Sequence, residues 1–473
     1  MARGRVVTRR DRLRPRLHTG TGITDATCAS LCGSRRVAIV ADASLGRIAR
    51  PLADEVGMRA AVVRVMLIDA RSVDDGVVER LAGDLIDGRA EVVVAVGGGT
   101  VIDAAAVAAL AVSSPSVFAY ALARAGRGPV VELPPREPSG IAFIAVPTTV
   151  GTSAESNAVA VLRTERGFRL LLGDRLRPDH AVLDAANYAS LPSDTVREGA
   201  LEALLRVTGA RTSARADGRA SSRAVGVVRA LLAAGSATEP DALRIARLSA
   251  ATQRAGVLCG RDPFASRHWY LANETAFVSG LSKMQATAAV IGSVWRRIDA
   301  GDSRWGDAGA LQTFWADAAC DAGLPTEPAR GIDELLDRWR VPRAERPTDE
   351  VLAAAAEATR RTWGAPVPAL GELGSGDHRR VLDNGRWAKP AIGGRVESLS
   401  ASHGREEVKR NDIAHDHTTA AVRGARRSGG PELGELLPGS PGRTDRGRHR
   451  SRHRDLSHAA CSSTATSQAL GRR

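Results

Sequence analysis

Three consecutive glycines, Gly97–Gly99, are the first residues in the sequence whose type and spacing could do chemistry. They stand between Glu91–Val96, which has the β-branched composition of a buried strand, and the alanine-rich stretch Val101–Val112, which is typical of a helix. Glycines at a strand-to-helix turn let backbone N–H groups approach an anion, and the helix dipole favours pyrophosphate there. Because the spacing is not G-x-G-x-x-G, the turn alone is also consistent with a tight connection that binds nothing.

A second turn, Pro147–Glu155, follows the apolar stretch Ile141–Val146. It is dense with hydroxyl side chains, namely Thr148, Thr149, Thr152 and Ser153. Hydroxyls and a glycine at the carboxyl end of a strand suit hydrogen bonding to ribose and phosphate, because open α/β sheets bind ligands at that edge. Each turn is weak evidence by itself, whereas the two together indicate a nucleotide site.

The elements that must position these turns alternate between strand and helix. Strands are expected over 37–41, 61–67, 91–96 and 141–146, and helices over 46–56, 73–87 and 101–112. This alternation predicts a parallel sheet with helices on both faces. After Leu191 the periodicity is helical, with helices expected over 194–209, 220–234, 241–258, 276–298 and 308–322.

These patterns predict four segments. A basic N-terminal extension covers 1–23, an α/β dinucleotide-binding domain 24–192, an all-helical domain 193–370, and a tail 371–473. The tail is dominated by Gly, Arg, Ser, His and Pro, so it cannot bury enough apolar surface to offset chain entropy and is expected to be disordered. A basic nucleic-acid-binding tail and an out-of-frame translation of the end of the gene are the alternatives.

The composition restricts the possible partners. The net charge of +13 invites a nucleic-acid hypothesis, but the basic excess lies mainly at the two ends, and an aromatic content of 3% leaves no stacking platform for single strands.

No segment approaches the roughly 20 apolar residues of a membrane span. Arg9 and Arg10 are not followed by an apolar region, so a secretory signal is not expected and the cytoplasm is. The five scattered cysteines, with Cys28 and Cys32 four apart, indicate reduced structural thiols.

The two turns resemble motifs of the iron-containing alcohol dehydrogenases, in the superfamily that includes glycerol dehydrogenase and dehydroquinate synthase. Gly97–Ala106 matches GGGSxxDxAK with Thr100 for Ser and Ala106 for Lys, and Pro147–Glu155 matches PTTxGTGSE with Ser153 and Ala154 for Gly-Ser. Leu176–Asp184 is similar to the family's L-x-P-x-x-x-x-x-D segment. The resemblance covers roughly Val37–Trp363 and includes neither the first 23 residues nor the tail.

The resemblance implies a two-domain fold, with a Rossmann-like parallel sheet followed by an all-helical domain, in a homodimer. It implies hydride transfer between NAD and an alcohol or carbonyl carbon of a small molecule or a peptide. The residues implied to hold the cofactor are Gly97, Gly98, Gly99, Thr100 and Asp103 around the pyrophosphate, Thr148, Thr149 and Thr152 at the adenine and nicotinamide ribose, Asp42 at the adenosine ribose, and Arg169 near the nicotinamide. Asp42 disfavours the 2′-phosphate of NADP without excluding it.

The metal motifs of the family are not matched. Family members hold a divalent metal with an Asp and three His, two of them in D-A-L-x-H, where this chain has Glu202 and Arg206. The G-x-x-H-x-x-x-H motif is matched by Gly280–Thr287, with Lys283 at its first histidine. Arginine is permanently cationic and cannot be a ligand. Seven of the ten histidines lie in the expected tail; the other three, His18, His180 and His268, form no helical pair and are expected to be structural or exposed. We therefore predict no catalytic metal.

Lys283 is the only lysine before the expected tail. With Arg206 and Glu202 it forms the predicted catalytic set, in which fixed cations polarise a carbonyl or stabilise an alkoxide and Lys283 relays the proton. The alternative is that Lys283 is an exposed helix residue in a degenerate site.

Three other functions stay open. Glu202 favours a cyclase or lyase of the dehydroquinate synthase type, although such enzymes also need metal histidines. The missing ligands favour a cofactor-binding helper of a partner enzyme that has no turnover of its own. A nucleic-acid-binding protein is the last alternative. Metal-divergent relatives in specialised metabolism make a role in ribosomal peptide natural products conceivable.

Overall fold

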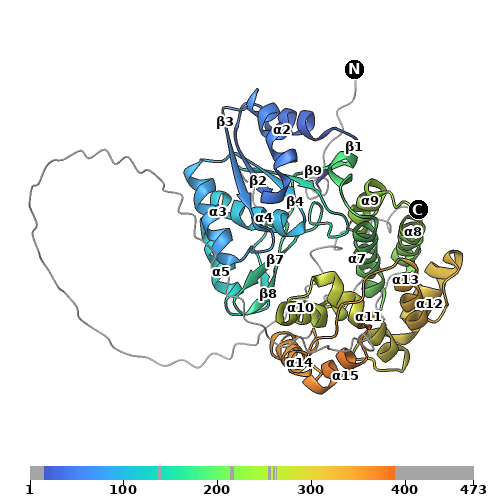
Figure 1. Cartoon of the computed structure of the whole chain (residues 1–473). Coiled ribbons are helices and arrows are strands. Elements are labelled where there is room, and N and C mark those ends of the chain that lie inside the picture. The colour runs from blue at the N-terminus through green and yellow to red at the C-terminus, as the bar shows by residue number, and fades with distance from the viewer. Residues whose placement is uncertain are drawn as a thin grey trace, which may run out of the picture. The chain divides into compact units, whose positions relative to one another are not determined.

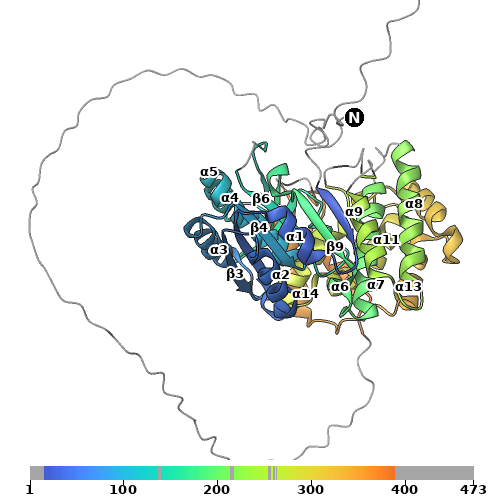
Figure 2. The same cartoon turned by 90° about the horizontal axis from the view of Figure 1, so that it is seen from above.

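The structure, a computed structural model, describes residues 15–388 except 137–139, 213–217, 254–256, 259–261, 263, 366 and 368, and leaves out the side chains of 218–221 as well. All described residues belong to one compact unit of the chain. Figure 1 shows its sheet and flanking helices in blue to green and its helical part in green to orange, and both are visible again in Figure 2.

A six-stranded parallel sheet forms the N-terminal part, as predicted. Its strand order is β1-β9-β6-β4-β2-β3. The strands are β1 (Arg16–Gly20), β2 (Arg36–Asp42), β3 (Val62–Ile68), β4 (Val92–Gly97), β6 (Ala142–Pro147) and β9 (His180–Asp184). Every residue of β4 is buried, which explains its uninterrupted run of valine and alanine: a central parallel strand is covered on both faces.

Helices cover both faces of this sheet. α1 (Thr24–Cys32) and α2 (Gly46–Gly57) share a core with Val94, whereas α3 (Asp75–Asp87) and α4 (Gly99–Ser113) share another with Val93. Neighbouring residues of β4 thus point into opposite cores, as the pleat of a strand requires. α5 (Pro115–Ala125) packs beside α4.

A second, three-stranded sheet was not expected from the sequence. It consists of β5 (Val130–Glu132), β8 (Gly167–Leu172) and β7 (Val159–Thr164), in that order, and β7 and β8 form an antiparallel hairpin. The alternating burial of Ala160, Leu162 and Thr164 is the period-two pattern of a strand with one buried face.

The C-terminal part is helical, as predicted. Its helices are α6 (Ala185–Tyr188), α7 (Ser193–Arg211), α8 (Gly218–Gly235), α9 (Ala242–Thr252), α10 (His268–Ser279), α11 (Lys283–Asp299), α12 (Ala308–Ala319), α13 (Pro328–Arg338), α14 (Asp349–Trp363) and α15 (Ser375–Asp383). Short 3₁₀ turns lie at Ala43–Leu45, Asp174–Leu176 and Cys320–Ala322. Across the described residues, no helix combines the length and apolarity that a membrane crossing requires.

The single helix expected over 276–298 is wrong, because it is two helices. Gly280 ends α10 in the left-handed conformation at φ 74°. Ser282 then starts α11 with a capping box, in which its side chain accepts from Gln285 N and its own N–H donates to the Gln285 side chain.

The expected N-terminal extension over 1–23 is wrong for the residues that the structure describes. β1 pairs with β9 in parallel register from Arg16↔His180 to Gly20↔Asp184. The Asp184 carboxylate then accepts from the backbone N–H of Gly22 and Thr24, at 2.7 and 2.9 Å. The basic composition concealed the strand, since its arginine and histidine lie at a sheet edge where they need little burial.

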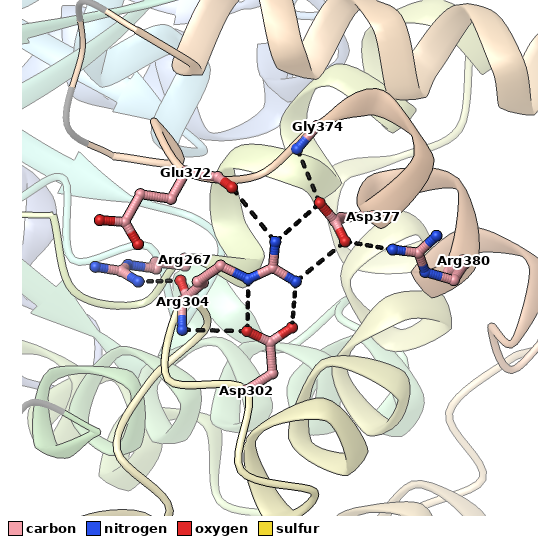
Figure 3. A network of polar contacts seen from close by, with 7 residues as sticks. All are labelled: Arg267, Asp302, Arg304, Glu372, Gly374, Asp377 and Arg380. Carbon is pink, nitrogen blue, oxygen red and sulfur yellow. Dashed lines mark hydrogen bonds and ion pairs between the residues drawn. The ribbon is translucent and has the colours of Figure 1, made fainter.

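The expected tail from 371 begins too early. α15 buries His378, Val381 and Leu382 in the helical core, so His378 belongs to the folded part. Arg304 anchors this helix: its guanidinium donates to both carboxylate oxygens of Asp377 at 3.1 Å and to those of Asp302 at 2.8 Å (Figure 3). Predictions for 389–473 lie outside the described residues, as do those for Cys259 and Cys461.

Candidate dinucleotide site

The glycine turn and the threonine turn lie side by side. β4 and β6 are neighbouring parallel strands with Gly97 opposite Pro147, so both turns leave the sheet at the same edge. The N–H of Thr148 donates to the Gly97 carbonyl at 3.0 Å. The fold therefore brings together two motifs that are about 50 residues apart in the chain.

The two turns touch through glycine backbone on one side and threonine side chains on the other. A Cβ on Gly98 would lie 3.2 Å from Thr149 Oγ1, and one on Gly99 would lie 3.1 Å from Thr152 Cγ2. Gly98 is the N-cap of α4, and the N–H groups of Gly99 and Thr100 come too early in the helix to have a carbonyl partner within it. The two turns need glycine to approach this closely, and together they form a cradle at the positive end of a helix, where backbone N–H groups can bind a phosphate or pyrophosphate. Thr100 is exposed in that first turn.

Asp42 stands at the same edge on the other side of β4. It is the last residue of β2, next to Ala41, which pairs with Val96. Its Oδ1 accepts from Ser44 N at 2.9 Å and from Ser44 Oγ at 2.6 Å, which holds the carboxylate at the strand end. The structure thus brings Asp42 to the edge where the glycine turn lies.

Asp103 and Arg169 are positioned differently. Asp103 lies on α4 and its carboxylate accepts from Val161 N at 2.9 Å, so it fastens α4 to the hairpin. The Arg169 guanidinium donates to three backbone carbonyls, those of Ala125, Arg166 and Phe168. Within the described part of the chain, none of the hydrogen bonds of Arg169 reaches either turn.

Arg206 joins the helical part to the threonine turn. From α7 its Nη2 donates to the carbonyls of Gly151 at 2.5 Å and Thr152 at 3.0 Å, and its Nη1 donates to Thr252 Oγ1 at 3.1 Å. The backbones also meet nearby, because a Cβ on Gly151 would lie 2.5 Å from Gly199 Cα. The Arg206 guanidinium is therefore hydrogen-bonded to other groups of the protein.

Lys283 and Glu202 form an ion pair between α11 and α7. Lys283 Nζ lies 3.4 Å from Glu202 Oε1 and 4.5 Å from the centre of the Trp269 ring. The Glu202 side chain is 10% exposed and that of Lys283 is 42% exposed, so the ammonium keeps access to solvent. Burial, and next the positive charge of Lys283, lower the pKa of His268 to about 3, so this buried imidazole is neutral.

Charged residues of the α/β part and of the helical part act on one another near the two turns. Burial raises the pKa of Asp103 to about 7, and the charges of Lys283 and Glu202 also act on it. Burial likewise raises the pKa of Glu155 to about 7, and the charges of Arg206 and Glu202 act on that group. Glu155 belongs to the second motif but was not predicted as a site residue, because only its burial and the charged residues around it in the fold indicate a role.

The residues at the family's metal positions do not fit a divalent metal. Arg206 and Lys283 stand where the motifs have histidine; a guanidinium has no free lone pair, and an ammonium repels a cation. Thr287, at the next motif position, donates its hydroxyl to the Lys283 carbonyl at 2.8 Å. The described residues hold no group of three or more His, Cys, Asp or Glu suited to a metal ion. His18 and His180 hydrogen-bond to each other at 3.1 Å, and His180 begins β9.

Known proteins are similar to this chain mainly in its α/β part. Residues 15–185 match the family model of the iron-containing alcohol dehydrogenases. In these residues, which form the α/β part, the chain is similar to the iron-containing alcohol dehydrogenases. The phosphonoacetaldehyde reductase of Streptomyces viridochromogenes is 38% identical over 155 residues, which are 32% of this chain and 38% of that protein. A probable alcohol dehydrogenase, EutG, of Salmonella typhimurium is 34% identical over 29% of this chain and 33% of its own length.

The chain therefore matches only about a third of the length of these curated relatives, whereas its fold matches whole family structures. The NADH-dependent butanol dehydrogenase A of Thermotoga maritima superimposes with a TM-score of 0.65 at 15% identity, over 79% of this chain and 97% of that one. The iron-containing alcohol dehydrogenase of Thermococcus thioreducens gives 0.62 at 17% identity, over 78% and 97%. At such identities the likeness shows the two-domain fold.

Proposed function

We propose that this protein is an NAD-dependent oxidoreductase that interconverts an alcohol and a carbonyl compound. The observation that carries the proposal is the cradle in which Gly98 and Gly99 face Thr149 and Thr152 at the N-terminus of α4. NAD is favoured over NADP because the Asp42 carboxylate at the end of β2 would repel a 2′-phosphate. When bound, the nicotinamide would supply or accept the hydride.

In this proposal the chain's own residues bind and orient the dinucleotide. The first-turn amides of α4, including that of Thr100, hold the pyrophosphate, and the hydroxyls of Thr149 and Thr152 hydrogen-bond to ribose and phosphate. Thr148 is buried and its N–H is bound to Gly97, so it fixes the relative position of the two turns.

Lys283 is the cation available to the substrate. Its ammonium is partly exposed, and Glu202 and Trp269 hold it in place. There it donates a hydrogen bond to the carbonyl oxygen, stabilises the negative charge that develops on that oxygen, and delivers the proton. Arg206 was predicted to act together with Lys283, but its guanidinium donates to carbonyls of the threonine turn, on the side of the cofactor.

A second candidate is a dinucleotide-binding helper without turnover. It is supported by the same ion pair, since Glu202 lies within 3.4 Å of Lys283 and competes with a substrate for the ammonium. Both candidates bind the dinucleotide, and only the oxidoreductase turns it over.

The experiment is to measure NADH binding by fluorescence titration and then NADH oxidation with a panel of aldehydes and ketones. The panel includes phosphonoacetaldehyde, because a relative is named for it, and aldehyde-bearing peptides. Binding with turnover supports the oxidoreductase, and binding with no turnover on any compound of the panel supports the helper. A protein that binds neither NADH nor NADPH would overturn both.

A further inference from the structure

The threonine turn is held by two helices of the helical part. Its Gly151 carbonyl accepts from Arg206 Nη2 on α7 and from Ser249 Oγ on α9, the latter at 2.9 Å. Its Ser153 hydroxyl accepts from Gln253 Nε2 at 3.1 Å, directly after α9. The turn is thus not a free loop of the α/β part, because its backbone is fixed from the other half of the protein.

The Arg206 guanidinium is the centre of this attachment. It bridges the carbonyls of Gly151 and Thr152 and also donates to Thr252 Oγ1, so one side chain connects α7, α9 and the turn. A hydrogen bond from a charged donor to a half-buried carbonyl is stronger than a neutral one. Its loss would leave the turn with fewer constraints.

The attachment reaches the cradle through one residue. Thr152 offers its carbonyl to Arg206 and its side chain to Gly99, where a Cβ would come within 3.1 Å of Thr152 Cγ2. A shift of the Thr152 backbone therefore moves the wall of the phosphate cradle. Arg206 itself lies behind this wall, bonded to its carbonyl side.

We infer that Arg206 is a positioning residue for the dinucleotide: it holds the threonine turn against the glycine turn and so sets the affinity for the pyrophosphate. This inference rests on the proposed cofactor. In this chain the helical part therefore contributes to cofactor binding through the position at which the family motif has a metal histidine.

The test compares Arg206→Gln with Arg197→Gln. Arg197 lies on the same helix, and its guanidinium likewise donates to three backbone carbonyls, those of Gly235, Ala237 and Thr238, none of them in the turn. NADH and ADP are titrated into each variant, ADP because it carries the pyrophosphate without the nicotinamide, and thermal unfolding is followed in parallel.

We expect Arg206→Gln to weaken NADH and ADP binding by about 10-fold or more, and Arg197→Gln by less than about 2-fold. Arg206→Lys should restore part of the affinity, and Thr252→Val, which removes one contact, should lose about 2- to 5-fold and serves if Arg206→Gln fails to fold. Equal affinities for the wild type and Arg206→Gln, or equal losses in both glutamine variants, would overturn the positioning role while leaving the cofactor proposal intact. A wild-type protein that binds neither NADH nor ADP would overturn both.

Discussion

Lys283 Nζ lies 3.4 Å from Glu202 Oε1, in an ion pair that joins α11 to α7. A half-exposed ion pair contributes little to the free energy of unfolding because solvent screens it. Its effect is on orientation: Glu202 and the Trp269 ring fix where the ammonium stands.

Replacing Lys283 by Met should lower kcat by about 100-fold at saturating NADH, because it removes the donor to the developing oxyanion. The Kd for NADH should stay within about 2-fold of the wild type, since the cradle is untouched. Arg297→Met, on the same helix, removes one positive charge elsewhere and is the control. Unchanged turnover in Lys283→Met would show that Lys283 has no catalytic role.

Gly99→Ala should weaken NADH binding by about 10-fold, because the new Cβ would come within 3.1 Å of Thr152 Cγ2 and fill the cradle. Gly83→Ala is the matched control: it lies within α3 with nothing within 4 Å of its Cβ, and it should stabilise the fold slightly. The readouts are fluorescence titration and thermal unfolding. An affinity in Gly99→Ala equal to that of the wild type contradicts the cradle.

Gly151→Ala should lower the free energy of unfolding by about 3 kcal/mol. Gly151 has φ +107°, and its Cβ would lie 2.5 Å from Gly199 Cα, so both backbone strain and overlap oppose the change. Gly226→Ala on α8, with open space around its Cβ, is the control. Urea unfolding followed by circular dichroism measures both, and a loss below about 1 kcal/mol would show that the two backbones can separate easily.

Glu274 should make stability depend on pH. It is 1% exposed and accepts from Trp363 Nε1 at 2.9 Å, and burial raises its pKa to about 7. The unfolded chain releases this proton near its ordinary pKa of 4.5. Stability from this group is therefore complete below pH 4.5 and is lost as the pH rises toward 7.

The measurement is urea unfolding of the wild type and Glu274→Gln between pH 5 and 7. The difference in their unfolding free energies should change by up to about 1.4 kcal/mol per pH unit, with the wild type losing stability as the pH rises. The exposed Glu132→Gln gives the baseline. A difference that does not vary with pH would show that Glu274 is ionised throughout this range.

Arg304→Met should loosen α15, because this guanidinium joins Asp302 to Asp377 (Figure 3). We expect faster hydrogen exchange of the α15 amides and a Tm lower by about 2 °C. Arg360→Met, which removes an exposed pair with Glu357, should change neither. Unaltered exchange in α15 would mean that burial of Val381 and Leu382 suffices to hold the helix.

The part of the fold that the sequence predicts is the part with regular periodicity. β4 and α4 could be predicted because a buried valine-rich strand and an alanine-rich helix each have a distinctive run of residues in the sequence. β1 could not, since an edge strand of arginine and histidine carries no apolar alternation. α15 was not predicted for a similar reason, because it is a short charged helix of which only one side is buried.

The candidate site was predictable where motifs are local and not where partners are distant. Gly97–Gly99 and the threonine turn follow from strand ends in the sequence. The sequence suggested that Arg206 and Lys283 share one role, but their partners separate them: Arg206 bonds to the Gly151 carbonyl and Lys283 to Glu202. Such pairings join residues tens of positions apart, so they depend on the tertiary fold.

The contact between Gly151 and Gly199 couples the backbones of the two parts of the protein. A side chain on Gly199 would run into the Val150 carbonyl, just as one on Gly151 would run into Gly199. Neither position can accept a side chain while the other backbone stays in place, although one lies in the threonine turn and the other in α7. A substitution in this stretch of α7 should therefore change the geometry of the threonine turn as well, although α7 itself carries none of the hydroxyls of that turn.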